Sequence, residues 1–341
     1  MPGDPVGVVG AGAMGSEIAL VAALAGRDVV LRDLDAPRVQ AGIARAQRVA
    51  QRLLQKGRIA GDPDAVERRI AHITPSVHDQ DLRHCAVVIE AVSERREVKE
   101  RVFAELGRTL DHDAVLASST AGLSVTALGR AAGRERTTIG LHFFHPPSEM
   151  RLVEVVRGER TGPTTVVRAL DVLRDMDKVA VVVKECPGFL VNRILTRAAC
   201  SAYRETLRRD ADLAGVDAEV LRDGQAAVGP FALGDVVGLD TMARLRDDLT
   251  RAYGARFWDD GVLDPYVAAG RLGRGTGPGF FEGPVTPHPR VGAAERAVAR
   301  AFYDAARDEA RRCVAESVAA PDDVTTAMKL GAGWSGGPFS P

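Results

Sequence analysis

A glycine-rich turn close to the start of the chain limits the possible folds more than any other feature of the sequence. The turn reads GAGAMG at residues 10–15 and follows an apolar run at residues 6–9, which predicts a buried strand. An apolar-faced helix is predicted for residues 16–25, and a second strand for residues 28–31, after the turn at Gly26. A strand, a helix and a parallel strand in this order form the βαβ unit of doubly wound α/β domains.

The three glycines of this turn have the spacing of a dinucleotide-binding motif. Gly10 allows the tight turn, Gly12 lets backbone amides approach a pyrophosphate, and Gly15 allows the helix to pack closely on the strand. Asp33, after the second predicted strand, can accept hydrogen bonds from the adenosine ribose hydroxyls and would repel a 2′-phosphate. The motif therefore predicts NAD as the cofactor, bound by Gly10, Gly12, Ala13, Met14, Gly15 and Asp33.

Two arginines near Asp33 bear on the choice between NAD and NADP. Arg32 and Arg38 could attract the 2′-phosphate of NADP, whereas exposed arginines beside a carboxylate are usually solvated surface groups. Both interpretations stay open at the level of the sequence, and the carboxylate of Asp33 favours NAD.

Alternating strands and helices continue to about residue 185 and then stop. Helices are predicted at residues 37–57, 64–71, 96–110 and 163–176, and further strands at residues 86–90, 114–117, 138–144, 151–156 and 178–184. This pattern predicts an α/β chain with a Rossmann-type doubly wound sheet over residues 1–185. From residue 186 the strand signals end, so we expect an all-helical C-terminal domain.

The helical part contains an internal repeat at an offset of 108 residues. Val216 and the GPF segment at 229–231 recur as Val324 and the GPF segment at 337–339. We therefore expect a helical domain at residues 186–290 and a partial second copy of it at residues 291–341. The second copy could fold over the first or could complete a dimer.

The charge and the cysteine content argue against several classes of function. The 45 basic and 46 acidic residues give a net charge of −1, which provides no long-range attraction to nucleic acid or to an anionic membrane. No apolar run reaches the length of a membrane span. The four cysteines are scattered without a metal-ligand spacing, so we expect reduced thiols, a cytoplasmic location and no metal site.

Five further motifs lie in the order and spacing of a known enzyme family. They are VVIEAVSE at 87–94, LASST at 116–120, GLHFF at 140–144, MRLVEVV at 150–156 and CPGFLVNR at 186–193. Together they resemble the L-3-hydroxyacyl-CoA dehydrogenases over nearly the whole chain. They also resemble the dehydrogenase part of the bacterial multifunctional β-oxidation proteins, which carry a duplicated helical domain. The resemblance implies NAD-dependent oxidation of a 3-hydroxyacyl thioester to the 3-ketoacyl thioester.

The resemblance implies that His142 is the general base and that Glu154 orients it. Histidine suits proton abstraction from a hydroxyl because an ordinary imidazole titrates near neutral pH. Glu154 lies inside the apolar run at residues 152–156, where a buried carboxylate needs a partner. Alternatively, strand alternation would point Glu154 to solvent and leave His142 as a core histidine.

Other site residues follow from the same resemblance. Asn192 is expected to hydrogen-bond the substrate oxygen, although asparagine at the start of a helix is often only an N-cap. Glu94 and Lys99 match positions that contact the nicotinamide ribose, whereas by composition alone they would be a solvated pair. The family's usual serine before the catalytic strand and its asparagine near the nicotinamide are replaced here by Ala121 and His145.

These two replacements predict an altered substrate pocket. The hydroxyl missing at Ala121 would remove one hydrogen bond to the reacting oxygen, a loss of about 2–4 kcal/mol of barrier stabilisation, unless Ser119 or Thr120 substitutes for it. Two alternatives to an ordinary family member therefore stay open. One is the same chemistry on an unusual acyl thioester, including one bound to a carrier protein, and the other is a dinucleotide-binding protein with weak turnover.

A basic stripe on the first long helix is the predicted site for the thioester carrier. Arg45, Arg48, Arg52 and Lys56 recur at near-helical spacing and could hold the 3′-phosphate of coenzyme A, although such a stripe is often plain surface. The expected partners are an acyl-CoA or acyl-carrier thioester and, as is usual in the family, a second copy of the chain in a homodimer. Nucleic acid and membrane are not expected.

Overall fold

The chain divides into two compact units, residues 1–185 and residues 186–341. The computed structural model describes residues 4–222, 224–283 and 291–339. The predicted boundary at residue 290, between the helical domain and its partial copy, lies outside the described residues.

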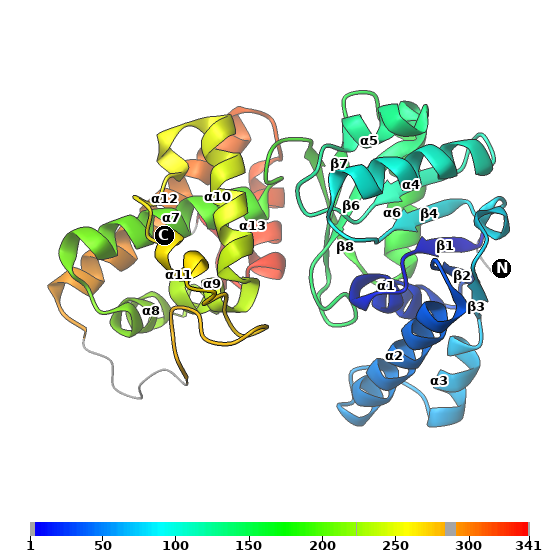
Figure 1. Ribbon diagram of the computed structural model, residues 1–341, viewed down its shortest axis with the longest axis horizontal. Helices are drawn as coiled ribbons and strands as arrows, with labels where there is room; N and C mark the ends of the chain where they lie inside the picture. The colour runs from blue at the N-terminus through cyan, green and yellow to red at the C-terminus, as the bar shows by residue number, and fades with distance from the viewer. Residues whose placement is uncertain (1–3, 223, 284–290, 340–341) are drawn as a thin grey trace. The chain divides into compact units, whose positions relative to one another are not determined.

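The first unit is built on one sheet of eight strands in the order β3-β2-β1-β4-β5-β6-β7-β8 (Figure 1). All neighbouring strands are parallel except β6 and β7, which are antiparallel. This order, with crossovers on both sides of β1, is that of a doubly wound α/β fold. The strands are β1 (Val6–Val9), β2 (Val29–Arg32), β3 (Ile73–Ser76), β4 (Val87–Glu90), β5 (Val115–Ser118), β6 (Thr138–Phe143), β7 (Leu152–Arg157) and β8 (Val179–Lys184).

Helices cover both faces of this sheet. Apolar side chains of α1, α2, α3 and α6 pack on one face, and those of α4 and α5 pack on the other. Because both faces are covered, most strands are buried on both sides, which explains their continuous apolar runs. The helices are α1 (Ala13–Leu24), α2 (Ala36–Gln55), α3 (Pro63–Ile70), α4 (Arg96–Thr109), α5 (Val125–Ala132) and α6 (Pro163–Asp175), with short 3-10 turns η1 (Asp79–Leu82) and η2 (Glu135–Thr137).

Two elements of this unit are missing from the predictions. Strand β3 has exposed residues at Thr74 and Pro75 and lies at the edge of the sheet, so it carries little apolar signal. Helix α5 is only eight residues long, and its start is marked by Ser124, whose hydroxyl accepts a hydrogen bond from the Ala127 amide. Helix α1 also begins three residues earlier than predicted, at Ala13, because Gly15 lies inside the helix.

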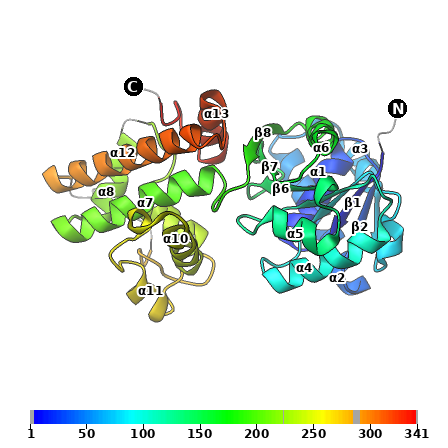
Figure 2. The ribbon, with the colours of Figure 1, turned by 90° about the horizontal axis from the view of Figure 1, so that it is seen from above.

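The second unit is helical, and none of its described residues forms a strand. Helix α12 packs along α7, and the two run side by side in both views (Figures 1 and 2). The helices are α7 (Val191–Arg209), α8 (Leu213–Arg222), α9 (Pro230–Val237), α10 (Leu239–Tyr253), α11 (Asp264–Ala268), α12 (Ala293–Ala315) and α13 (Pro321–Gly331), with the turn η3 (Ala255–Phe257).

Two further observations concern the chain as a whole. Among the described residues, no helix is both long enough and apolar enough to cross a bilayer. All four cysteines carry reduced thiols, as the sequence predicts.

Candidate active site

The glycine turn connects β1 to α1 and leaves the start of the helix open. Gly10 has φ +102°, and a Cβ there would lie 2.7 Å from the carbonyl oxygen of Ala91. A Cβ on Gly15 would lie 1.8 Å from the carbonyl oxygen of Gly10, so only glycine allows this approach of helix to turn. Gly12 is the N-cap of α1, where no side chain caps the helix and a Cβ would meet nothing within 4 Å.

Asp33 is held at the end of β2 beside this turn. Its carboxylate accepts hydrogen bonds from the amide of Ala11 and from the amide of Leu34, each at 2.6 Å. The uncapped helix start and this fixed carboxylate are the two features that a dinucleotide requires, because the first faces a pyrophosphate and the second accepts from ribose hydroxyls. The residues present therefore fit NAD.

Both arginines near Asp33 are paired with other carboxylates. Arg32 forms an ion pair with Asp79 at 2.8 Å, and its side chain is 13% exposed. Arg38 forms an ion pair with Asp35 at 2.9 Å on the surface. Neither arrangement offers an unneutralised guanidinium for a 2′-phosphate, which supports the preference for NAD.

His142 and Glu154 face each other across the antiparallel pair of β6 and β7. His142 Nδ1 lies 2.6 Å from Glu154 Oε2, and the two residues are 6% and 0% exposed. The interpretation that Glu154 points to solvent is therefore wrong. The ring of Phe144 lies next to the imidazole, with centroids 4.6 Å apart. This pair can orient a base and stabilise it when it is positively charged, the role of the acidic member in a hydrolase triad.

A buried charge network lies below the loops that follow β4 and β5. Lys99 Nζ forms ion pairs with Glu90 at 2.6 Å and with Glu94 at 3.3 Å, and Glu90 also accepts a hydrogen bond from the Ser118 hydroxyl at 2.7 Å. The Lys99 side chain is 1% exposed, so the interpretation of Glu94 and Lys99 as a solvated pair is wrong for Lys99. Lys99 anchors Glu94, whose side chain is 46% exposed at the rim of the network.

The sequence reasoning missed Glu90 and Ser118 as parts of this network. Their signal is a polar residue at the last position of each of two buried strands, β4 and β5. The two residues are also partners in the strand register. A buried carboxylate at that position needs donors, and Lys99 and Ser118 supply them.

The loop after β5 shows which hydroxyl could replace the one missing at Ala121. Thr120 is fully buried, its hydroxyl donates to Glu94, and the same oxygen accepts from the amide of Leu123. It is therefore committed to the loop and cannot reach a substrate. Ser119 is half-buried, and its backbone amide donates to the carbonyl of Glu90 at 2.8 Å. Its hydroxyl therefore remains the candidate to replace the one missing at Ala121.

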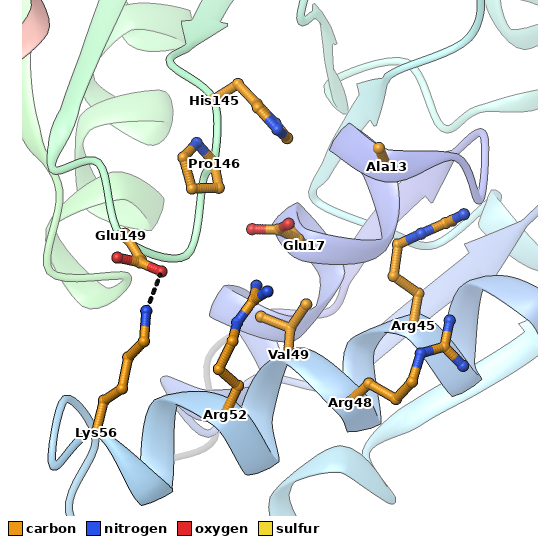
Figure 3. Close-up of a pocket in the computed structure, with 10 residues that line it drawn as sticks. All are labelled: Ala13, Glu17, Arg45, Arg48, Val49, Arg52, Lys56, His145, Pro146 and Glu149. Atoms are coloured by element: carbon orange, nitrogen blue, oxygen red, sulfur yellow. Dashed lines mark ion pairs between the residues drawn. The ribbon is translucent and has the colours of Figure 1, made fainter. Parts of the chain in front are cut away.

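The predicted basic stripe lines a pocket of about 570 Å³ in the first unit (Figure 3). Arg45, Arg48, Arg52 and Lys56 come from one face of α2 and its C-terminal end, as their spacing predicts. The remaining lining residues come from α2 itself, from the first turns of α1 and from the loop between β6 and β7: Val49, Ala13, Glu17, His145, Pro146 and Glu149. His145 is thus exposed at the same pocket as the start of α1.

The loop that carries His145 is tied to the rest of the unit. Ser148 donates to the buried carboxylate of Glu17 through both its hydroxyl, at 2.5 Å, and its amide, at 3.2 Å. Lys178 Nζ donates to the carbonyls of Pro147 at 2.6 Å and Met150 at 2.9 Å. Burial lowers the pKa of Lys178 to about 8. The loop is therefore fixed from two sides.

Asn192 lies on the helical unit, as the second residue of α7. The N-cap of that helix is Leu190, which makes no side-chain capping bond, so the interpretation of Asn192 as an N-cap is wrong. The next residue, Arg193, is fully buried and forms ion pairs with Glu309 and Glu316, each at 2.7 Å. Asn192 is thus presented by a firmly anchored helical turn.

Two family models match this chain and together span most of it. The model for the NAD-binding domain of 3-hydroxyacyl-CoA dehydrogenase matches residues 5–186, and the model for its C-terminal domain matches residues 188–283. The α subunit of the fatty acid oxidation complex of Pseudomonas aeruginosa (strain LESB58) is 34% identical over 276 residues, which are 80% of this chain. The chain spans 38% of the length of that curated relative.

Solved structures give the same relationship. The (S)-3-hydroxybutyryl-CoA dehydrogenase of Ralstonia eutropha matches with a TM-score of 0.78 and 32% identity, over 82% of this chain and 98% of that one. The 3-hydroxybutyryl-CoA dehydrogenase of Escherichia coli K12 shares the fold over 99% of this chain and 91% of that one, with a TM-score of 0.89 and 24% identity. The chain belongs to the 3-hydroxyacyl-CoA dehydrogenase family of NAD-dependent oxidoreductases.

Proposed function

We propose that this protein oxidises an L-3-hydroxyacyl thioester to the 3-ketoacyl thioester, with His142 as the general base. The observation that carries the proposal is the buried pair of His142 Nδ1 and Glu154 Oε2, 2.6 Å apart, in a unit that also holds the NAD turn. A histidine held by a buried carboxylate is poised to receive a proton, since the carboxylate stabilises the charge that forms.

In this proposal the chain's own residues handle the proton. With Nδ1 directed at Glu154, the ring nitrogen that takes the hydroxyl proton of the substrate is Nε2. As the O–H bond breaks, the carbonyl forms and the carbon loses its hydrogen with both bonding electrons. NAD would supply the hydride acceptor when bound. Glu94 would hold the nicotinamide ribose, and Lys99 positions Glu94 through their ion pair at 3.3 Å.

The acyl carrier is assigned to the basic pocket. Arg45, Arg48, Arg52 and Lys56 offer four positive charges along one helix face, which suits the phosphates of coenzyme A. In the proposal Asn192 binds the substrate oxygen and Ser119 substitutes for the hydroxyl missing at Ala121.

The test is an assay of NADH formation at 340 nm with NAD and 3-hydroxybutyryl-CoA. We expect turnover by the wild type and a loss of at least about 100-fold in H142A, because general-base catalysis contributes on the order of 10²–10⁴. H72A is the matched control, since His72 forms a similar pair with Asp28 at 2.7 Å on the surface of the same unit. Full activity of H142A would refute the proposed base.

Two observations favour a second candidate, the same reaction on an unusual acyl thioester. Ala121 and His145 both differ from the usual family residues, and Thr120 is unable to compensate for the first. A screen of several 3-hydroxyacyl thioesters, on coenzyme A and on a carrier protein, separates the candidates. Tight NADH binding without turnover of any of them would instead identify a weakly active dinucleotide-binding protein.

We further propose that the protein forms the homodimer that is usual in the family and that it works in the cytoplasm. Because α12 of the same chain already packs along α7, a dimer would use another surface of the helical unit. Light scattering of the purified protein measures the mass directly.

A further inference from the structure

An ion pair lies at one end of the basic pocket. Lys56 at the end of α2 and Glu149 on the loop between β6 and β7 face each other, with Nζ and Oε1 3.6 Å apart (Figure 3). Their side chains are 52% and 33% exposed, so both reach the solvent-filled space that a ligand would enter. The ammonium group of Lys56 therefore already pairs with a carboxylate in the absence of a ligand.

The other cations of the pocket are not neutralised in this way. Within residues 4–222, 224–283 and 291–339, no carboxylate lies within ion-pair distance of Arg48 or Arg52. Arg45 makes one long contact of 3.4 Å with the carbonyl of Ala11, beside the glycine turn. Of the pocket's two carboxylates, the buried Glu17 accepts from Ser148, whereas Glu149 pairs directly with a cation, Lys56.

The carboxylate at this end is held in place by its loop. Ser148, the neighbour of Glu149, is anchored to the buried Glu17, and the carbonyl of Met150 on the other side accepts from Lys178. Because the residues before and after Glu149 are fixed, its backbone stays at the pocket. Rotation of the Glu149 or the Lys56 side chain would therefore separate the two charges.

The two ends of the pocket serve different ligand groups. Lys56 follows Arg45 by eleven positions, which is about 16 Å along a helix. Arg45 lies at the turn that receives the pyrophosphate of NAD, so an anion at Lys56 belongs to the other ligand, the thioester carrier. Coenzyme A carries a 3′-phosphate in addition to its pyrophosphate, and this second anionic group suits the far end.

We propose that Glu149 competes with the 3′-phosphate of coenzyme A for Lys56 and thereby limits how tightly the pocket holds this carrier. The inference rests on the proposed acyl-CoA substrate. A phosphate and a carboxylate repel each other, so the ligand must displace Glu149 from Lys56 to bind there. Glu149 is then a specificity-determining residue, which disfavours carriers that place a phosphate at this end.

The test is calorimetric titration of the whole protein with CoA and with dephospho-CoA, which lacks the 3′-phosphate. We expect E149Q to bind CoA roughly fivefold more tightly than the wild type, the scale of one exposed charge interaction, and dephospho-CoA with unchanged affinity. In a K56M background the same substitution should have no effect on CoA binding. E159Q, which changes the net charge equally at an exposed residue outside the pocket, is the control.

Each outcome decides between the two proposals. Tighter CoA binding by E149Q that disappears in K56M supports the competition. If K56M weakens CoA binding but E149Q leaves it unchanged or weakens it, the competition is overturned and the CoA site stands. Two other results are that CoA binds neither the wild type nor E149Q, or that K56M binds CoA as well as the wild type does. Either result would refute both the assignment of this pocket to coenzyme A and the proposed competition.

Discussion

Replacing Glu154 by glutamine isolates the electrostatic part of the His142–Glu154 pair. Glutamine has nearly the same volume and can still accept a hydrogen bond from Nδ1, so the variant removes the negative charge and keeps the contact. Opposite charges whose centres are about 4 Å apart interact by about 4 kcal/mol at an effective dielectric constant of about 20. The hydrogen bond between Nδ1 and the glutamine oxygen retains about 1 kcal/mol of this interaction energy.

A net loss of about 3 kcal/mol in the transition state corresponds to a roughly 150-fold decrease of kcat. The measurement is kcat for thioester oxidation in E154Q and wild type, with the melting temperature and the NADH affinity measured alongside. D28N provides the control, because it removes the charge from the exposed His72–Asp28 pair. If E154Q folds, binds NADH normally and keeps kcat within threefold of the wild type, the carboxylate does not stabilise a charged base and the mechanism is wrong.

Two other predictions concern the framework of the first unit. G15A should abolish NADH binding and strongly destabilise the unit, because its Cβ would lie 1.8 Å from the Gly10 carbonyl oxygen; thermal melting and NADH fluorescence check this, and a stable binder would refute the packing argument. Burial lowers the pKa of Lys178 to about 8, below the ordinary lysine pKa of 10.5, so the charged form is disfavoured in the folded state. The stability of the wild type relative to K178M should therefore rise between pH 8 and pH 10.5, and a difference in melting temperature that is constant across this range would contradict it.

The glycine turn and the strand pattern made the first unit predictable from the sequence. Their signals are local, because each rests on residues adjacent in the chain. The pair of His142 and Glu154 was predictable for a different reason: a carboxylate inside an apolar strand needs a partner, and the family resemblance names that partner. Their contact depends on the antiparallel register of β6 and β7, which no local pattern specifies.

The sequence does not predict contacts between segments that are far apart along the chain. Glu90 and Ser118 are 28 residues apart and meet only because their strands are neighbours in the sheet. Glu17 and Ser148 are 131 residues apart, and each by itself is an ordinary polar residue. The basic stripe was visible as a helix face, but the acidic residue opposite Lys56 lies on a loop whose path depends on the whole unit.

The packing of α12 along α7 affects how the amino-acid sequences of these two helices can evolve. In a symmetric dimer each interface residue must suit both copies at once, because one gene encodes both sides. Here the two sides are separate stretches of sequence: Arg193 pairs with Glu309, whereas the reciprocal positions at the repeat offset of 108 are Ala301 and Ser201, which carry no charge. Each helix is thus free to acquire substitutions that its counterpart does not share.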